Sequence, residues 1–312
     1  MDNPRTVDSA ASQMINKSTV RETSMIADIK SLIKVGIINS NLITTFTGFW
    51  LAMYFTGASF TEHWLTFILT MFGTAFLIAG GCIINNWYDR DIDHLMSRTV
   101  TRPTVTGTIP LNVIKWMGIS VTSLGFIILL FTTVEAALFG AFGWFVYVVL
   151  YTMWSKRKYT INTVIGSFSG AVPPLIGWAA IEPGLRLEAI ILFLIMFIWQ
   201  TPHFLALAMR KKDDYKAAGI PMLPVVHGFK MTKRQMVVYV ACLLPLPIYL
   251  VSLGSIFLGV AFALSFGWLV LGMAGFIMKD DYKWAKWMFV YSLNYLTILF
   301  LTMVLVTLSF PF

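Results

Sequence analysis

The sequence predicts an all-α polytopic membrane protein with nine transmembrane helices. Of its 312 residues, 57% are hydrophobic and only 12% are charged, and the mean hydropathy is +0.75. A soluble globular domain carries roughly twice that share of charged residues. Apolar runs recur along the whole length, and each can cross a hydrocarbon core of about 30 Å as a helix. The runs are continuous and do not alternate with polar residues, which favours helices over the strands of a membrane barrel.

Nine apolar runs, separated by charged or turn-forming segments, define the expected spans in order. They cover Val35 to Thr56, Trp64 to Asn85, Asn112 to Thr133, Ala136 to Trp154, Asn162 to Ala180, Ala189 to Ala208, Met236 to Ser252, Ile256 to Met278 and Phe289 to Phe310. The pair Pro173-Pro174 is predicted to bend or break the fifth span, because proline removes a helical hydrogen bond. The shortest break, near Ser255, separates the seventh and eighth spans.

Basic residues are concentrated in the loops after the second, fourth, sixth and eighth spans. The opposite loops are short, and Arg186 is their only cation. By the positive-inside rule, the large loops and the N-terminus are expected in the cytoplasm and the C-terminus outside. The net charge of +8 therefore reports topology, and it does not indicate nucleic-acid binding.

The sequence divides into a tail and one membrane domain. Residues 1–28 are polar, and a disordered cytoplasmic tail is expected there, whereas residues 29–312 form the transmembrane domain. The two cysteines, Cys82 and Cys242, lie inside predicted spans. They are interpreted as small packing residues rather than as a disulfide.

A charged stretch, CIINNWYDRDIDHLMSRTVTRP, follows the second span directly. Asn85, Asp89 and Asp93 are spaced four apart, so they share one face if the helix continues past the membrane surface. Clustered carboxylates need a cation to stay ionised in a low-dielectric setting, and an all-oxygen set favours Mg²⁺. Arg98 and Arg102 follow in the same loop, and guanidinium groups suit phosphate binding. The alternative is a solvated helix end with ordinary surface ion pairs.

A second charged stretch, ALAMRKKDDYKAAGIPMLPVVHG, follows the sixth span on the same predicted membrane face. It holds Asp213, Asp214 and Tyr215 beside Lys212 and its basic neighbours. Two such clusters at one rim predict a single site, closed from both sides, for a metal-bridged diphosphate. A transporter would more often place its ion site near the bilayer midplane.

Two further polar residues near span ends have two interpretations each. Lys158, before the fifth span, either sets the topology or contacts diphosphate. His203, near the end of the sixth span, is more often hydrogen-bonded to a neighbouring helix than a ligand, if taken alone.

The motif Asn85-x-x-x-Asp89-x-x-x-Asp93 resembles the signature of the UbiA-type intramembrane prenyltransferases. Three stretches are similar to the haem-farnesylating branch of that family: DRDIDHLMSRTVTRP at 89–103, YTINTVIGSFSGAVPPLIGW at 159–178 and WQTPHFLALAMRKKDDYKAAGIPMLPVVHG at 199–228. The resemblance runs from about Asp28 to the last expected helix. It implies a UbiA-type helix bundle, which agrees with the nine spans.

The resemblance implies a reaction and roles for the residues above. Farnesyl diphosphate would alkylate a vinyl group of protohaem with addition of water, giving haem O, with haem as substrate and Mg²⁺ as cofactor. Asn85, Asp89, Asp93, Arg98 and Arg102 would be catalytic; Asn85, Asp89, Asp93, Asp213 and Asp214 would bind metal; Lys158, Lys212, Asp213, Asp214, Tyr215 and His203 would bind substrate. His203 becomes the leading candidate for contacting haem.

Two departures from the family pattern stand out. The second site holds the adjacent pair Asp213-Asp214 where many members have Asp-x-x-x-Asp, and the first span begins with Lys34-Val35-Gly36 where many relatives of this branch have Lys-Pro-Arg. The first departure bears on direct metal binding by the second cluster, and the second removes one candidate phosphate-binding arginine.

The implied setting is the inner membrane of a bacterial cell, with the active site facing the cytoplasm. Farnesyl diphosphate, protohaem and the lipid bilayer are the expected partners, and a haem A synthase or oxidase assembly proteins are candidate protein partners. Two alternatives stay open: a prenyltransferase acting on an aromatic quinone precursor, and a cation-coupled transporter or haem carrier without catalysis.

Overall fold

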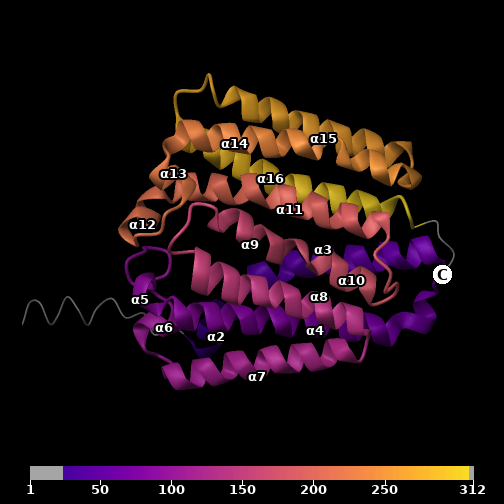
Figure 1. Cartoon of the computed structure of the whole chain (residues 1–312), viewed down its shortest axis with the longest axis horizontal. Coiled ribbons are helices and arrows are strands. Elements are labelled where there is room, and N and C mark those ends of the chain that lie inside the picture. The colour runs from indigo at the N-terminus through magenta and orange to yellow at the C-terminus, as the bar shows by residue number, and fades with distance from the viewer. Residues whose placement is uncertain (1–23, 309–312) are drawn as a thin grey trace, which may run out of the picture.

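The computed structural model describes residues 24–308, and every regular element among them is a helix. The long helices run side by side along the longest axis of the molecule (Figure 1). Four short helices gather at one end of this bundle (Figure 1): α5 (Arg90–Asp93), α6 (Pro103–Thr106), α12 (Lys212–Ala217) and α13 (Leu223–Val226). The predicted all-α class is confirmed. Of the expected tail, residues 1–23 lie outside the described range, and α2 (Met25–Ile33) begins within its last residues.

Seven helices in the described part of the chain are long and apolar enough to cross a membrane. They are α4 (Phe60–Tyr88), α7 (Leu111–Leu130), α8 (Val134–Phe145) continued by η1 (Val146–Ser155), α11 (Leu187–Arg210), α14 (Gly228–Leu243) continued by η2 (Leu246–Leu253), α15 (Ser255–Ala274) and α16 (Asp281–Leu305). Each corresponds to one of the nine expected spans. The protein is therefore a polytopic membrane protein.

The other two expected spans correspond to helices that are more polar or interrupted. Helix α3 (Val35–Thr56) has the expected bounds, but it carries buried threonines such as Thr44, Thr45 and Thr47, whose hydroxyls donate to carbonyl oxygens one turn earlier. The fifth span is divided into α9 (Asn162–Ala171) and α10 (Pro173–Ala179). This break falls at the proline pair, as predicted.

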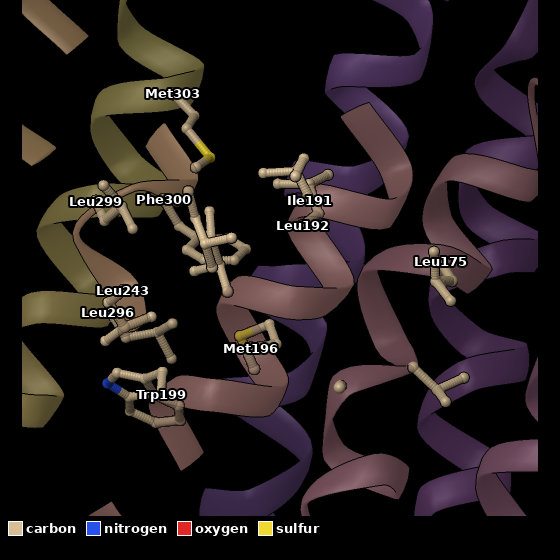
Figure 2. Close-up of a cluster of buried hydrophobic side chains, with 14 of the residues drawn as sticks. Leu175, Ile191, Leu192, Met196, Trp199, Leu243, Leu296, Leu299, Phe300 and Met303 are labelled. Carbon is tan, nitrogen blue, oxygen red and sulfur yellow. The ribbon is translucent and has the colours of Figure 1, made fainter. Parts of the chain in front are cut away.

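The apolar core lies where α11 meets α16. Figure 2 shows their side chains facing one another: Ile191, Leu192, Met196 and Trp199 from α11, and Leu296, Leu299, Phe300 and Met303 from α16. Leu243 joins from α14, and Leu175 lies on α10 (Figure 2). Burial of such side chains fixes α11 in the middle of the bundle, and two of them, Met196 and Trp199, also line the cavity described below.

Helices α3 and α10 pack at backbone distance because glycines face each other's chain. A Cβ atom at Gly48 would lie 2.1 Å from the carbonyl oxygen of Pro174, and one at Gly177 would lie 2.0 Å from that of Thr45. No side chain fits at such distances, so the two helices can touch only through glycine.

Replacing Gly177 by alanine is expected to lower the stability of the purified protein by about 1–3 kcal/mol, the usual cost of overpacking. The thermal unfolding midpoint in detergent measures this change. Gly259→Ala is the matched control, because a Cβ there meets nothing within 4 Å and alanine favours the helix. Equal midpoints for the two variants would contradict the close contact.

Candidate active site

One cavity of about 360 Å³ opens between α3, α4, η1, α9 and α11, and a cluster of polar groups lies toward the end that carries the short helices. These groups belong to Lys34, Asn85, Arg98, Arg102, Lys156 and Tyr215. The body of the cavity is lined by apolar residues such as Leu77, Val172 and Met196. This shape suits a molecule with a strongly charged head and a hydrocarbon tail.

Asn85, Asp89 and Asp93 lie on one continuous helical path, as their spacing predicts. Helix α4 ends at Tyr88, but the backbone nitrogen of Asp89 donates to the Asn85 oxygen at 2.9 Å, and that of Asp93 donates to the Asp89 oxygen at 3.0 Å. All three side chains are buried, with 3%, 0% and 0% of their surface exposed. Two buried carboxylates one turn apart require compensating positive charge.

The compensating charge for Asp89 comes from the segment after η1. Lys156 donates to Asp89 Oδ2, and Arg157 donates to Asp89 Oδ1 at 3.3 Å. Arg157 also forms two hydrogen bonds, of 2.6 and 2.8 Å, with Asp91. Hydrogen bonding to the Arg157 guanidinium lowers the pKa of the Asp91 carboxyl, and the same hydrogen bonds raise the pKa of Arg157.

Asp93 has one paired and one free oxygen. Arg102 donates to its Oδ2 at 2.6 Å, whereas its Oδ1 is buried without a hydrogen-bond partner. A buried carboxylate oxygen is rarely left unpaired. The free atom and the all-oxygen set of Asn85, Asp89 and Asp93 fit a hard divalent cation.

The amide of Asn85 is held in a fixed orientation. Its nitrogen donates to Asp89 Oδ2 at 2.9 Å and to Thr152 Oγ1 at 3.0 Å, so both of its hydrogens are used. Its oxygen accepts from Lys34 Nζ at 2.5 Å. Lys34 is the residue between α2 and α3 and has a φ of 55°. Burial of its ammonium group away from water lowers its pKa to about 8.

Helix η1 sets which basic residue after it faces the cavity. It is a π-helix, in which hydrogen bonds reach back five residues: the Lys156 nitrogen donates to the Tyr151 oxygen at 2.9 Å. This wider turn brings Tyr147, Tyr151 and Lys156 to the cavity. Lys158, a candidate for diphosphate contact from the sequence, is exposed and does not line the cavity.

The second charged cluster meets the first through Ser97 and Arg98. The Ser97 hydroxyl donates to Asp214 Oδ1 at 3.0 Å, and the Arg98 guanidinium lies over the Tyr215 ring, 5.5 Å from its centroid. Burial raises the pKa of the Tyr215 hydroxyl. The contacts bring the two predicted clusters together at one end of the cavity.

Three members of the second cluster, Asp214 among them, do not line the cavity. Asp213 is exposed, and the Lys212 ammonium lies over the Phe229 ring at 4.8 Å. Within residues 24–308, no three His, Cys, Asp or Glu side chains come close enough to hold a metal ion by themselves. A metal at the first cluster would thus need ligands from the substrate or water.

His203 lines the cavity with one ring nitrogen in use. Its Nδ1 lies 2.7 Å from the Ser292 hydroxyl oxygen, and that hydroxyl donates its hydrogen to the Phe289 carbonyl at 2.6 Å. Ser292 must therefore accept from His203, which places the proton on Nδ1 and leaves Nε2 with a free lone pair. The ring stacks between Trp199 and Phe289, 4.8 Å from each.

Comparison with known families identifies the architecture. The model of the UbiA prenyltransferase family matches residues 41–294. The chain is a member of the UbiA prenyltransferase family. Membership agrees with the polar rim and apolar body of the cavity.

Full-length relatives of this UbiA family member carry names that specify a reaction. A protein from Geobacillus sp. (strain WCH70), named protoheme IX farnesyltransferase, is 59% identical over 99% of this chain and 100% of its own length. A protein from Bacillus subtilis (strain 168), named protoheme IX farnesyltransferase 2, is 58% identical over 96% of this chain and 99% of its own.

Solved structures of other members share the fold. A digeranylgeranylglyceryl phosphate synthase superposes with a TM-score of 0.72 at 20% identity, covering 91% of this chain and 99% of that one. A UbiA homolog from Archaeoglobus fulgidus, bound to GPP and Mg²⁺, superposes with a TM-score of 0.62 at 14% identity, covering 88% of this chain and 99% of that one. The UbiA bundle is thereby confirmed.

The sequence alone missed two of the basic residues at the cavity. Lys34 and Lys156 contact Asn85 and Asp89 directly, yet each is one cation among several near a span end. Their position beside a helix boundary is the signal that could have found them: Lys34 directly precedes α3, and Lys156 directly follows η1.

Proposed function

We propose that this UbiA family member transfers a farnesyl group from farnesyl diphosphate to a vinyl group of protohaem, with addition of water, giving haem O and diphosphate. The observation that carries the proposal is the 59% identity, over nearly the whole of both chains, to a protein named protoheme IX farnesyltransferase. The cavity supports the donor half, because a farnesyl chain is all hydrocarbon and its diphosphate is highly charged.

Four basic residues are assigned to the diphosphate. Lys34, Arg98, Arg102 and Lys156 all line the polar end of the cavity. As the allylic carbon–oxygen bond breaks, negative charge grows on the leaving oxygens, and fixed cations stabilise it without rearranging. The farnesyl chain then extends into the apolar body, where the developing carbocation is shielded from bulk water. Tyr147 and Tyr151 also line the cavity, and aromatic rings can stabilise a nearby positive charge.

Asn85, Asp89 and Asp93 are assigned to Mg²⁺. When bound, the ion would neutralise the diphosphate and speed its departure. In the structure, Lys34 pairs with Asn85 and Arg102 pairs with Asp93. We infer that these two cations turn to the diphosphate when the substrate arrives, releasing the side-chain oxygens as ligands. A UbiA homolog of the same fold has been solved with GPP and Mg²⁺.

The second cluster is assigned to positioning and acceptor binding. Through Ser97, Asp214 holds the loop that carries Arg98 and Arg102. Asp213 and Lys212, which lie outside the cavity, remain candidates for a substrate-bound state only. His203 presents its free Nε2 for the haem acceptor.

The proposed setting is a bacterial cell membrane with nine crossings. Helix α3 and the pair α9 and α10 complete the seven longer helices, because they lie among them in the same direction (Figure 1). The basic loops then face the cytoplasm together with the active site. A reporter fused after residue 58 would be exposed outside if α3 crosses.

Purified protein in detergent, given protohaem, farnesyl diphosphate and Mg²⁺, is expected to convert haem to a product heavier by farnesyl plus water. Liquid chromatography with mass spectrometry measures this gain. A chelator should abolish this mass gain and excess Mg²⁺ should restore it, because without the metal the negative charge on the leaving diphosphate is not neutralised. Haem left unchanged, while an aromatic quinone precursor is prenylated, would overturn the proposed acceptor.

A further inference from the structure

The amide of Gln200 is a buried polar group in the cavity without a hydrogen-bond partner in the protein. Gln200 lies on α11, lines the cavity and is 4% exposed. Across the described residues, neither its oxygen nor its nitrogen forms a hydrogen bond. Polar groups buried within a membrane protein normally find partners, because an unpaired amide loses its interactions with water.

The polar neighbours of Gln200 on the same helices are all paired. The Trp199 indole nitrogen donates to the Ser292 carbonyl at 2.8 Å, His203 Nδ1 donates to the Ser292 hydroxyl, and the Ser169 hydroxyl donates to the Gly166 carbonyl at 2.7 Å. Among these neighbours on α9 and α11, Gln200 alone has an unpaired polar side chain that lines the cavity, and this points to a ligand supplied from the cavity.

The site of this amide is built around a glycine. A Cβ at Gly170 would lie 2.3 Å from Gln200 Oε1, so the amide fits only because residue 170 has no side chain. One turn earlier on α9, Gly166 makes the same kind of room for the Tyr151 ring, whose hydroxyl is also unpaired within the described chain. Gly170 is eight positions after Asn162, about 12 Å along the helix axis from the polar end.

We propose that Gln200 holds the water molecule that becomes the hydroxyl group of the product. The proposal rests on the proposed function, because only a farnesyl transfer that also adds water requires a water molecule to be held in the cavity. An ordered water needs two to four polar partners. The Gln200 amide supplies two of these, an acceptor oxygen and a donor nitrogen, and Tyr151 and His203 line the same cavity.

The reaction gives this water a defined step. The C1–O bond of farnesyl diphosphate breaks and the diphosphate leaves with the electron pair. The vinyl π electrons form the new bond to C1, which leaves positive charge on the vinyl carbon attached to the porphyrin. The water oxygen donates a lone pair to that carbon, and its proton passes to the departed diphosphate. Without an aligned water, the same cation loses a proton from the neighbouring CH₂ and gives an alkene lacking one water.

Gln200 is accordingly a positioning residue for water, and its loss should change which product forms. In Gln200→Met, which keeps the size but removes the amide, the ratio of dehydrated product to haem O is expected to rise about tenfold. Gln200→Glu, which keeps an oxygen acceptor, should restore the wild-type ratio. Reactions in H₂¹⁸O report the hydroxyl oxygen directly by mass spectrometry.

Gly170→Ala tests the same site without altering Gln200, because the added Cβ displaces the amide. It should also raise the dehydrated fraction, and it replaces Gln200→Met as the test if that variant does not fold. Thr201→Val is the matched control: Thr201 is buried on the same helix but does not line the cavity. Its product ratio should equal that of wild type.

Two results would overturn the inference. One is a wild-type product ratio in both Gln200→Met and Gly170→Ala. The other is weaker protohaem binding by Gln200→Met, measured by absorbance titration, with an unchanged product ratio, which would make Gln200 an acceptor contact. Wild-type protein that leaves protohaem unmodified would instead overturn the proposed function itself.

Discussion

Asp89→Asn is expected to lower kcat/KM for farnesyl transfer by about 10³-fold, the range found when one preorganised electrostatic contact is removed. Asp89 is fully buried and accepts from Asn85, Lys156 and Arg157. An amide of the same shape cannot supply the negative charge that the metal and these cations require. Product formation by mass spectrometry at saturating Mg²⁺ measures the loss.

The same change also leaves Lys156 buried without its partner, which costs about 3–5 kcal/mol in stability. The double variant Asp89→Asn, Lys156→Met removes both charges and should recover the thermal unfolding midpoint while remaining inactive. Recovery of transfer in the double variant would show that Asp89 acts on folding alone.

Lys156→Met is expected to reduce kcat/KM by about 10²-fold, because the cation nearest Asp89 at the cavity is lost. Most of the loss should appear in kcat, since negative charge on the leaving group grows only in the transition state. Steady-state kinetics with farnesyl diphosphate as the varied substrate separate kcat from KM.

Lys158→Met decides between the sequence hypothesis and the geometry. If Lys158 contacts the diphosphate, its replacement will cause the larger loss, and the role assigned to Lys156 will be wrong. Lys279→Met, at an exposed position on the loop between α15 and α16, is the neutral control for removing one positive charge.

Local patterns in the sequence predicted the helices and the acidic motif. The apolar runs predicted the all-α fold class and all seven confirmed spans, and Pro173-Pro174 predicted the break in the fifth span. The four-residue spacing of Asn85, Asp89 and Asp93 placed them correctly on one face, because a helix relates such positions through its own backbone.

Contacts between distant helices could not be predicted in this way. The pairing of Lys34 with Asn85 and of Lys156 with Asp89 depends on how α3, α4 and η1 pack. Of the three consecutive basic residues 156–158, Lys156 rather than Lys158 lines the cavity. This depends on the π-helical turn of η1, which the hydrophobic pattern of the sequence does not predict. The hydrogen bond from Ser97 to Asp214 joins a loop to helix α12 across 117 positions of the sequence.

The π-helical turn of η1 also bears on how the gene can change in length. Deleting one residue between Val146 and Ser155 would rotate the residues before the deletion by about 100° relative to those after it. The cavity would then lose either the tyrosines or Lys156. Surface loops tolerate insertions and deletions, whereas this membrane segment is constrained in residue number as well as in residue type. The number of residues in the segment 146–155 is thus more important for activity than the identity of its apolar residues.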